Sequence, residues 1–232
     1  MTKNKGAIAI LGGMGPEASA KMLEVLVSMA SREFGAQNGH DFPEIIIDSV
    51  PVPDFISDQR NLDLASKMLT SRIKKLQGLD IFCFAMACNT AHIMLSNLSK
   101  VSDKPFVSII DSVVSSVKAK DVKKVGLLAT PSTIGARLYQ DALAGADVGV
   151  TIPNQKELLV IEGIIRKVIA GKTSKTDERN LRRIADFFVA KGAQGIILGC
   201  TELPLVFPRD FPLPVFDSIE ILSRRLLTNF FE

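Results

Sequence analysis

Two cysteines lie at matching places in this sequence, and a pair of thiols can carry a proton to and from carbon. Cys88 follows the apolar run 81–86, and Cys200 follows the apolar run 195–198. Short apolar runs bounded by glycine and polar residues are typical of parallel strands that are buried on both faces. Each thiol is therefore expected where a strand ends and the next helix begins. That position binds ligands in α/β sheets and lowers the pKa of a thiol.

A second pair of similar segments predicts an internal repeat. The apolar run 8–11 and the glycine turn 12–15 resemble the run 125–129 and the small-residue segment 130–135, and their separation is close to that of the two cysteines. Two similar halves can present their cysteines to one cleft. We therefore predict an α/β fold of two similar lobes with parallel sheets, related by a pseudo-twofold axis, with the active site in the cleft between them.

Periodicity and turn residues predict the elements of these lobes. Strands are expected at 7–11, 45–47, 81–86, 106–110, 124–129, 148–152, 196–198 and 215–216, and helices at 16–34, 61–77, 90–100, 111–120, 133–144, 155–170, 176–191 and 219–230. The segment 48–58 contains two prolines and is expected to be a loop that leaves a strand end. Because the second copy is complete at Cys200, the last helix is expected to return to the first lobe. The predicted lobes are residues 1–104 with 210–232, and residues 105–209.

Composition narrows the class of protein. The 232 residues are 47% hydrophobic and 23% charged with a net charge of +3, and the apolar run 81–88 is too short to span a bilayer. Neither a membrane segment nor a nucleic-acid surface is expected. Residues 1–5 place two lysines before an apolar stretch, but that stretch ends at Gly12 and is expected to be a strand rather than a signal peptide. The three cysteines include no Cys-x-x-Cys pair, which predicts no disulfide framework, no structural zinc and a cytoplasmic location.

Two thiols that face each other suit the inversion of a stereocentre next to a carboxylate. One thiolate removes the proton from one face of the carbon and the other thiol donates to the opposite face, with the roles reversed for the other enantiomer. The negative charge that develops on the substrate as the proton leaves needs preorganised hydrogen-bond donors. Four polar residues at strand or helix ends can supply them: Asn89, Thr90, Thr133 and Thr201. Cys88 and Cys200 thus predict a racemase that needs no cofactor and no metal, whereas Cys83 is expected to be a core residue.

Three segments resemble the signature segments of the aspartate/glutamate racemase family, in particular its aspartate racemase branch. They are Gly12-Gly13-Met14-Gly15-Pro16, Cys88-Asn89-Thr90-Ala91-His92 and Gly199-Cys200-Thr201-Glu202. The resemblance covers essentially the whole chain. It implies a two-lobed α/β protein, usually a homodimer, that racemises an amino acid without pyridoxal phosphate and uses Cys88 and Cys200 as its acid/base pair.

The resemblance also implies residues that bind the substrate. Met14 would contribute at the glycine turn, and the same four polar residues, Asn89, Thr90, Thr133 and Thr201, would bind the α-carboxylate or the amino group. Glu202 stands where the glutamate racemase branch has a histidine. It would orient Cys200 or accept its proton.

Two departures from the family pattern concern the side chain of the substrate. Many aspartate racemases have Pro-Asp-Arg-Thr after the second strand, but this chain has Pro53-Asp54-Phe55-Ile56, and Ile169 stands in place of a lysine, with Lys172 nearby. The nearest substitutes on the loop are Gln59 and Arg60. We predict aspartate as the preferred substrate, with Arg60 binding its distal carboxylate through a bidentate fork. If Arg60 is a solvated charge instead, a pocket lined by Phe55 favours a less acidic amino acid.

Other functions stay open at this point. A zinc-dependent hydrolase would use Cys88, His92 and Cys200 as three metal ligands with one open position. A thiol hydrolase would need a histidine base, for which only His92 and His40 are available. A hinged binding protein would need neither cysteine. Hydantoin racemases and decarboxylases share the same superfamily, and the presence of both cysteines argues against decarboxylation.

Overall fold

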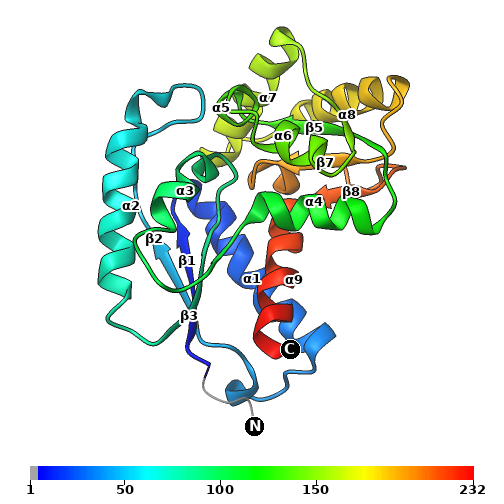
Figure 1. The fold of residues 1–232 in the computed structure, drawn as a ribbon. Helices are drawn as coiled ribbons and strands as arrows, with labels where there is room; N and C mark the ends of the chain where they lie inside the picture. The colour runs from blue at the N-terminus through cyan, green and yellow to red at the C-terminus, as the bar shows by residue number, and fades with distance from the viewer. Residues whose placement is uncertain (1–4) are drawn as a thin grey trace.

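The computed structural model describes residues 5–232 and consists of two α/β units, each built around a four-stranded parallel sheet (Figure 1). The first sheet has the order β2-β1-β3-β4 and the second has the order β6-β5-β7-β8. The strands are β1 Ala7–Gly12, β2 Ile45–Ser49, β3 Ile81–Met86, β4 Phe106–Val107, β5 Lys124–Ala129, β6 Gly149–Thr151, β7 Ile196–Gly199 and β8 Val215–Asp217. Because both sheets repeat one strand order, the prediction of two similar lobes is confirmed.

Nine α-helices and four short 3-10 helices join the strands within the described residues. The α-helices are α1 Pro16–Phe34, α2 Leu62–Leu76, α3 Leu95–Leu98, α4 Ile109–Ala119, α5 Pro131–Gly135, α6 Leu138–Ala144, α7 Gln155–Ile169, α8 Lys175–Ala190 and α9 Ser218–Phe231. The 3-10 helices are η1 Gly39–Asp41, η2 Gln59–Asn61, η3 Thr90–Met94 and η4 Leu203–Leu205. Within residues 5–232, no helix has the length and apolar character needed to cross a membrane. The expectation for residues 1–5 falls mostly on residues 1–4, which lie outside the described part.

Local chemistry explains where two predicted elements differ from the structure, and a third differs in its type of helix. The expected strand 106–110 is short because Ser108 caps α4, accepting a hydrogen bond from the Asp111 N–H, so the helix begins at Ile109. The expected helix 133–144 is split into α5 and α6 at Arg137, whose positive φ of 56° interrupts the helix. The segment after Cys88 begins as the 3-10 helix η3 before it becomes α3.

The register of the sheets brings corresponding strand ends together. Leu11 of β1 lies opposite Met86 of β3, and Ala129 of β5 lies opposite Gly199 of β7. Parallel neighbours that end together leave their following segments at one edge of the sheet. The glycine turn after β1 therefore adjoins Cys88, and Thr130 after β5 adjoins Cys200.

The two lobes share a hydrophobic core. One cluster of buried side chains contains Ile8 and Ile10 of the first sheet together with Val125 and Leu127 of the second. Helix α9 contributes Leu222, Leu226 and Phe230 to this cluster, and it packs against α1 and α4 (Figure 1). A second cluster covers the outer face of the first sheet, and a third covers the outer face of the second sheet.

Two strands lie across the predicted boundaries of the lobes. β4 at 106–107 pairs with β3 in the first sheet, and β8 at 215–217 pairs with β7 in the second. The strands that precede Cys88 and Cys200 each gain this edge partner from the chain that follows: Phe84 N–H donates to Pro105 O, and Ile196 N–H donates to Pro214 O. The division of the chain at residues 105 and 210 stays a prediction, and each of these two edge strands lies a few residues beyond the predicted crossing.

Candidate active site

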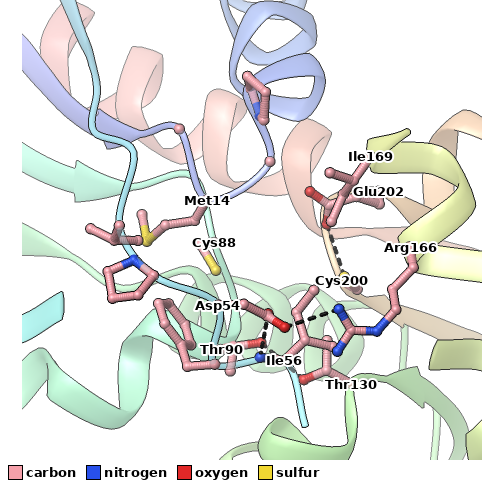
Figure 2. Close-up of a pocket in the computed structure, with 16 residues that line it drawn as sticks. Met14, Asp54, Ile56, Cys88, Thr90, Thr130, Arg166, Ile169, Cys200 and Glu202 are labelled. Carbon is pink, nitrogen blue, oxygen red and sulfur yellow. Dashed lines mark hydrogen bonds and ion pairs between the residues drawn. The ribbon is translucent and has the colours of Figure 1, made fainter. Parts of the chain in front are cut away.

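A cavity of about 290 Å³ lies at the carboxyl ends of the two sheets, and both strand-end cysteines line it (Figure 2). The first lobe contributes the turn 13–16, the loop 52–56, Cys88 and Thr90, and the second contributes Thr130, Arg166, Ile169, Cys200 and Glu202. The two thiols are free and nearly buried, with 8% of Cys88 and 5% of Cys200 exposed. The expectation that the two lobes present their cysteines to one cleft thus agrees with the placement of both thiols.

The pKa values of both thiols are raised, whereas the strand-end position predicts lowered values. Burial, and then the charge of Glu202, raises the pKa of Cys88 to about 12, although N–H groups of Ala91 and Thr90 act in the opposite direction. The same two causes raise the pKa of Cys200 well above its usual value. The predicted lowering is wrong because loss of water around each sulfur outweighs the helix-end donors. Both shifts favour the protonated form of the thiols at neutral pH.

Glu202 is the residue that makes the two thiols different. Its Oε2 atom accepts a hydrogen bond from the Cys200 Sγ at 2.9 Å and another from the Thr201 Oγ1 at 3.1 Å. The side chain is 3% exposed, and burial raises the pKa of its carboxyl group. Its other oxygen, Oε1, is buried and has no hydrogen-bond partner among the described residues.

Three threonine hydroxyls join the two lobes beside the thiols. The Thr90 Oγ1 lies 2.9 Å from the Thr130 Oγ1 and 3.0 Å from the Thr133 Oγ1. Thr90 and Thr130 line the cavity, whereas Thr133 is fully buried behind them. Thr130 is a cavity residue that the sequence reasoning did not identify. Its signal was its place directly before Pro131, where it caps α5 by accepting from the Thr133 N–H.

Asn89 and Thr201, both predicted to bind the substrate, lie outside the cavity lining and have internal partners. The Asn89 Nδ2 donates to the Ser218 Oγ at 3.0 Å, and the Tyr139 hydroxyl donates to the Asn89 Oδ1 at 2.6 Å. The Thr201 hydroxyl lies on Glu202 and 3.4 Å from the Ala87 carbonyl oxygen. These contacts use the polar groups to hold the strand ends in place, and direct substrate contact by Asn89, Thr133 and Thr201 stays a prediction.

Arg60 does not line the cavity, so the structure does not bring it together with the two thiols. Its side chain is 89% exposed and pairs with Asp58, two residues away. The side chain of Gln59 lies outside the described part of the structure.

Arg166 of α7, which the sequence reasoning missed, lines the cavity instead. It binds Asp54 at 2.9 Å (Figure 2). It also binds Glu162 at 2.9 Å and the Ser57 Oγ at 3.1 Å. The spacing signal was present, since Arg166 lies three residues before Ile169 and hence on the same helix face.

His92 serves the backbone rather than a metal. Its Nδ1 donates to the Cys88 carbonyl oxygen at 2.9 Å, and its Nε2 accepts from the Ile109 N–H at 3.1 Å. Burial lowers the pKa of His92 to about 4, so the ring is neutral. With both ring nitrogens occupied, His92 has no lone pair for the zinc site considered above, and no cluster suited to a metal occurs among residues 5–232.

Two matched α/β lobes, each with a thiol at the end of a central strand, thus meet at one cavity. The chain belongs to the Asp/Glu/Hydantoin racemase family, whose model matches residues 11–226. Its family membership makes it an isomerase of the racemase class, and the resemblance drawn from the sequence is confirmed.

Individual relatives agree with this assignment over nearly their whole length. An aspartate racemase homologue from Pyrococcus horikoshii OT3 has a similar structure, with a TM-score of 0.81, 31% identity and 100% of each chain covered. An aspartate racemase from Picrophilus torridus has a TM-score of 0.83 and 28% identity, over 97% of this chain and 94% of that one. The broad specificity amino-acid racemase RacX of Bacillus subtilis is 23% identical over 96% of this chain and 97% of its own length.

Proposed function

We propose that this chain interconverts the enantiomers of an amino acid without a cofactor, moving the Cα proton between Cys88 and Cys200. The observation that carries the proposal is that both thiols line one cavity, at the ends of the corresponding strands β3 and β7. A Cα held between them loses its proton to one sulfur and receives a proton from the other, which inverts the centre.

The high thiol pKa values suit the removal of the Cα proton of an amino acid, which is only weakly acidic. A thiolate whose conjugate acid has a pKa of about 12, as for Cys88, is a stronger base than an ordinary thiolate, although less of it is present at neutral pH. The hydroxyls of Thr90 and Thr130 are the donors that line the cavity beside the thiols, and we assign them to the α-carboxylate. Asn89, Thr133 and Thr201 act behind them as positioning residues.

Two kinds of substrate are candidates, aspartate and an amino acid with a less acidic side chain. Aspartate, expected from the sequence and favoured by the two aspartate racemase relatives, would need Arg166 for its distal carboxylate now that Arg60 lies outside. Arg166 already binds Asp54 and Glu162, so aspartate would have to displace one of these carboxylates. A less acidic amino acid needs no such exchange, and the walls formed by Met14, Phe55 and Ile169 suit it. Because a buried carboxylate without a free cation is costly, the ion pairs favour the less acidic substrate.

A racemisation assay tests the proposal. Purified protein, dialysed against a chelator and hydroxylamine, is given single enantiomers of aspartate, glutamate, alanine and methionine, and the appearance of the opposite enantiomer is followed by chiral chromatography. We expect turnover that survives the dialysis, with kcat/KM higher for methionine than for aspartate. A preference for aspartate would select the first candidate, and activity lost with a metal or a carbonyl cofactor would overturn the proposal.

We further propose that the protein works as a cytoplasmic homodimer. The three free thiols support a reducing compartment, and the family resemblance supports the dimer. Light scattering of the purified protein measures the mass, and a monomer under assay conditions would contradict this assignment.

A further inference from the structure

We infer that the Oε1 atom of Glu202 binds the α-ammonium group of the substrate, while its Oε2 atom holds Cys200. This inference deepens the proposed racemase function and rests on it for the identity of the ligand as an amino acid. It gives Glu202 two tasks, one for each carboxylate oxygen, and it defines what the site rejects.

The first observation is an acceptor without a donor. The side-chain hydrogen bonds that this carboxylate accepts, from Cys200 and Thr201, go to Oε2, and Oε1 is left unpartnered among the described residues although Glu202 lines the cavity. An unsatisfied buried carboxylate oxygen is costly, so a ligand that supplies a donor there gains the full value of the bond. The turn before α1 is shaped around this oxygen, because a Cβ on Gly15 would lie 1.6 Å from it.

The second observation is an anion without a counter-ion. Among residues 5–232, no cationic side chain bonds to Glu202, and the charge of Glu17 adds a further repulsion to the effect of burial. Arg166, the cation that lines the cavity, is bound to Asp54 and Glu162. A ligand for this site therefore brings its own positive charge, and burial makes a charge-assisted hydrogen bond to it strong.

The position of Glu202 identifies which cation fits. The Cys200 Sγ that exchanges the proton of Cα lies 2.9 Å from the same carboxylate (Figure 2). A group bonded directly to Cα is thus held within reach of Glu202 whenever Cα faces Cys200. In an amino acid that group is the α-ammonium, whatever the side chain is.

This contact also links binding to the state of the thiols. The charge of Glu202 disfavours the thiolate of both Cys88 and Cys200. An ammonium on Oε1 cancels that charge, so the substrate itself makes it easier for a thiol to lose its proton. Acids that lack the amino group bring no such compensation and are rejected.

Calorimetric binding of matched ligand pairs tests the inference. The pairs are L-methionine with 4-(methylthio)butanoate and L-aspartate with succinate, which differ only in the α-amino group. For the wild type we expect the amino acid of the better-bound pair to bind at least tenfold more tightly than its deaminated analogue. In Glu202→Gln, which keeps the shape of the side chain, this ratio falls to near one. In Glu202→Asp, which keeps the charge, it is partly retained.

A control separates ammonium binding from the orientation of Cys200. Thr201→Val removes one hydrogen bond to Oε2 and leaves the charge of Glu202, so the binding ratio is kept even if turnover falls. Equal binding of amino acid and analogue by the wild type, or an unchanged ratio in Glu202→Gln, would overturn the inference. The outcomes are distinguishable from failure of the proposed function: selective binding without racemisation removes the function and keeps the contact, whereas racemisation with no amine preference removes the contact alone.

Discussion

The segments that follow β3 and β7 occupy equivalent places in the two lobes but carry different chemistry. After Cys88 come N–H donors from Thr90 and Ala91, which favour its thiolate. After Cys200 comes Glu202, whose carboxylate accepts the hydrogen of the thiol and favours the protonated form. The repeated fold thus supplies two thiols at matching positions, and the residues next to them act differently on the two thiol pKa values.

The residues that line the cavity also differ in charge between the two lobes. Around Cys88 the first lobe presents largely apolar contacts such as Met14 and Phe55, with Asp54 as its one charged contribution to the lining. The second lobe contributes Arg166 and Glu202. The asymmetry shows that a duplicated scaffold can place two thiols at matching positions while the charged residues of the lining differ between its halves.

The largest expected effect comes from removing either member of the thiol pair. Cys88→Ala and Cys200→Ala should each lower racemisation by about 10³-fold or more, because one face of Cα loses its acid or base. Chiral chromatography of both reaction directions measures the loss. If either variant kept near wild-type turnover, the two thiols would not be equivalent partners in the reaction.

A smaller effect, on the preference between substrates, is expected from the ion pair between Asp54 and Arg166. Asp54→Asn frees Arg166 from one carboxylate while its Oδ1 can still accept the Ile56 N–H. The ratio of kcat/KM for aspartate over methionine should then rise by about 1 to 2 kcal/mol, roughly 5- to 30-fold, since a substrate carboxylate no longer competes with Asp54. Arg166→Ala should shift the ratio in the opposite direction. An unchanged ratio in both variants would show that Arg166 does not sense the side chain.

The pH profile sharpens the comparison of the thiols. Because burial raises both thiol pKa values, the free enzyme holds both protons at neutral pH and must lose one to act. Below these pKa values the thiolate fraction grows about tenfold per pH unit, so kcat/KM should rise with pH between about 6 and 8. A flat profile over this range would mean that a thiolate already exists in the free enzyme.

The smallest effect on catalysis is expected at the third cysteine. Cys83 is 1% exposed in the shared core and lies outside the cavity. Cys83→Ala should lower the free energy of unfolding by about 1 kcal/mol through a small cavity and leave kcat/KM unchanged. Urea denaturation and the racemase assay measure the two quantities, and a loss of activity in folded protein would place the site elsewhere.

Much of the framework could be predicted from the sequence because it depends on local patterns. The apolar runs before Cys88 and Cys200 predict buried strands, and their duplication predicts two similar lobes that face one another. The last helix was expected to return to the first lobe, and α9 does pack on α1, although it also contacts α4. These signals depend on hydrophobic periodicity, which burial enforces.

The charged part of the site is only weakly signalled in the sequence, because its ion pairs depend on how the lobes meet. Arg166 lies in the last turn of α7, where a basic residue is already explained by the helix dipole. Arg60 seemed suitable because it follows the redirected loop, but that loop turns its side chain to solvent. The thiol pKa values were predicted in the wrong direction because desolvation arises only when loop 52–56, Glu202 and the opposite lobe enclose the sulfurs.

Transfer of solvent label to Cα tests the two-thiol account most directly. Each enantiomer of the best substrate is converted in deuterated water, and the deuterium content of product and remaining substrate is measured by mass spectrometry at low conversion. The account predicts deuterium at Cα of nearly every product molecule and little in the remaining substrate, in both directions, because the thiol that donates is not the thiolate that removed the proton. Product that keeps its original hydrogen, or equal labelling of substrate and product from the first turnovers, would indicate a single base and contradict the account.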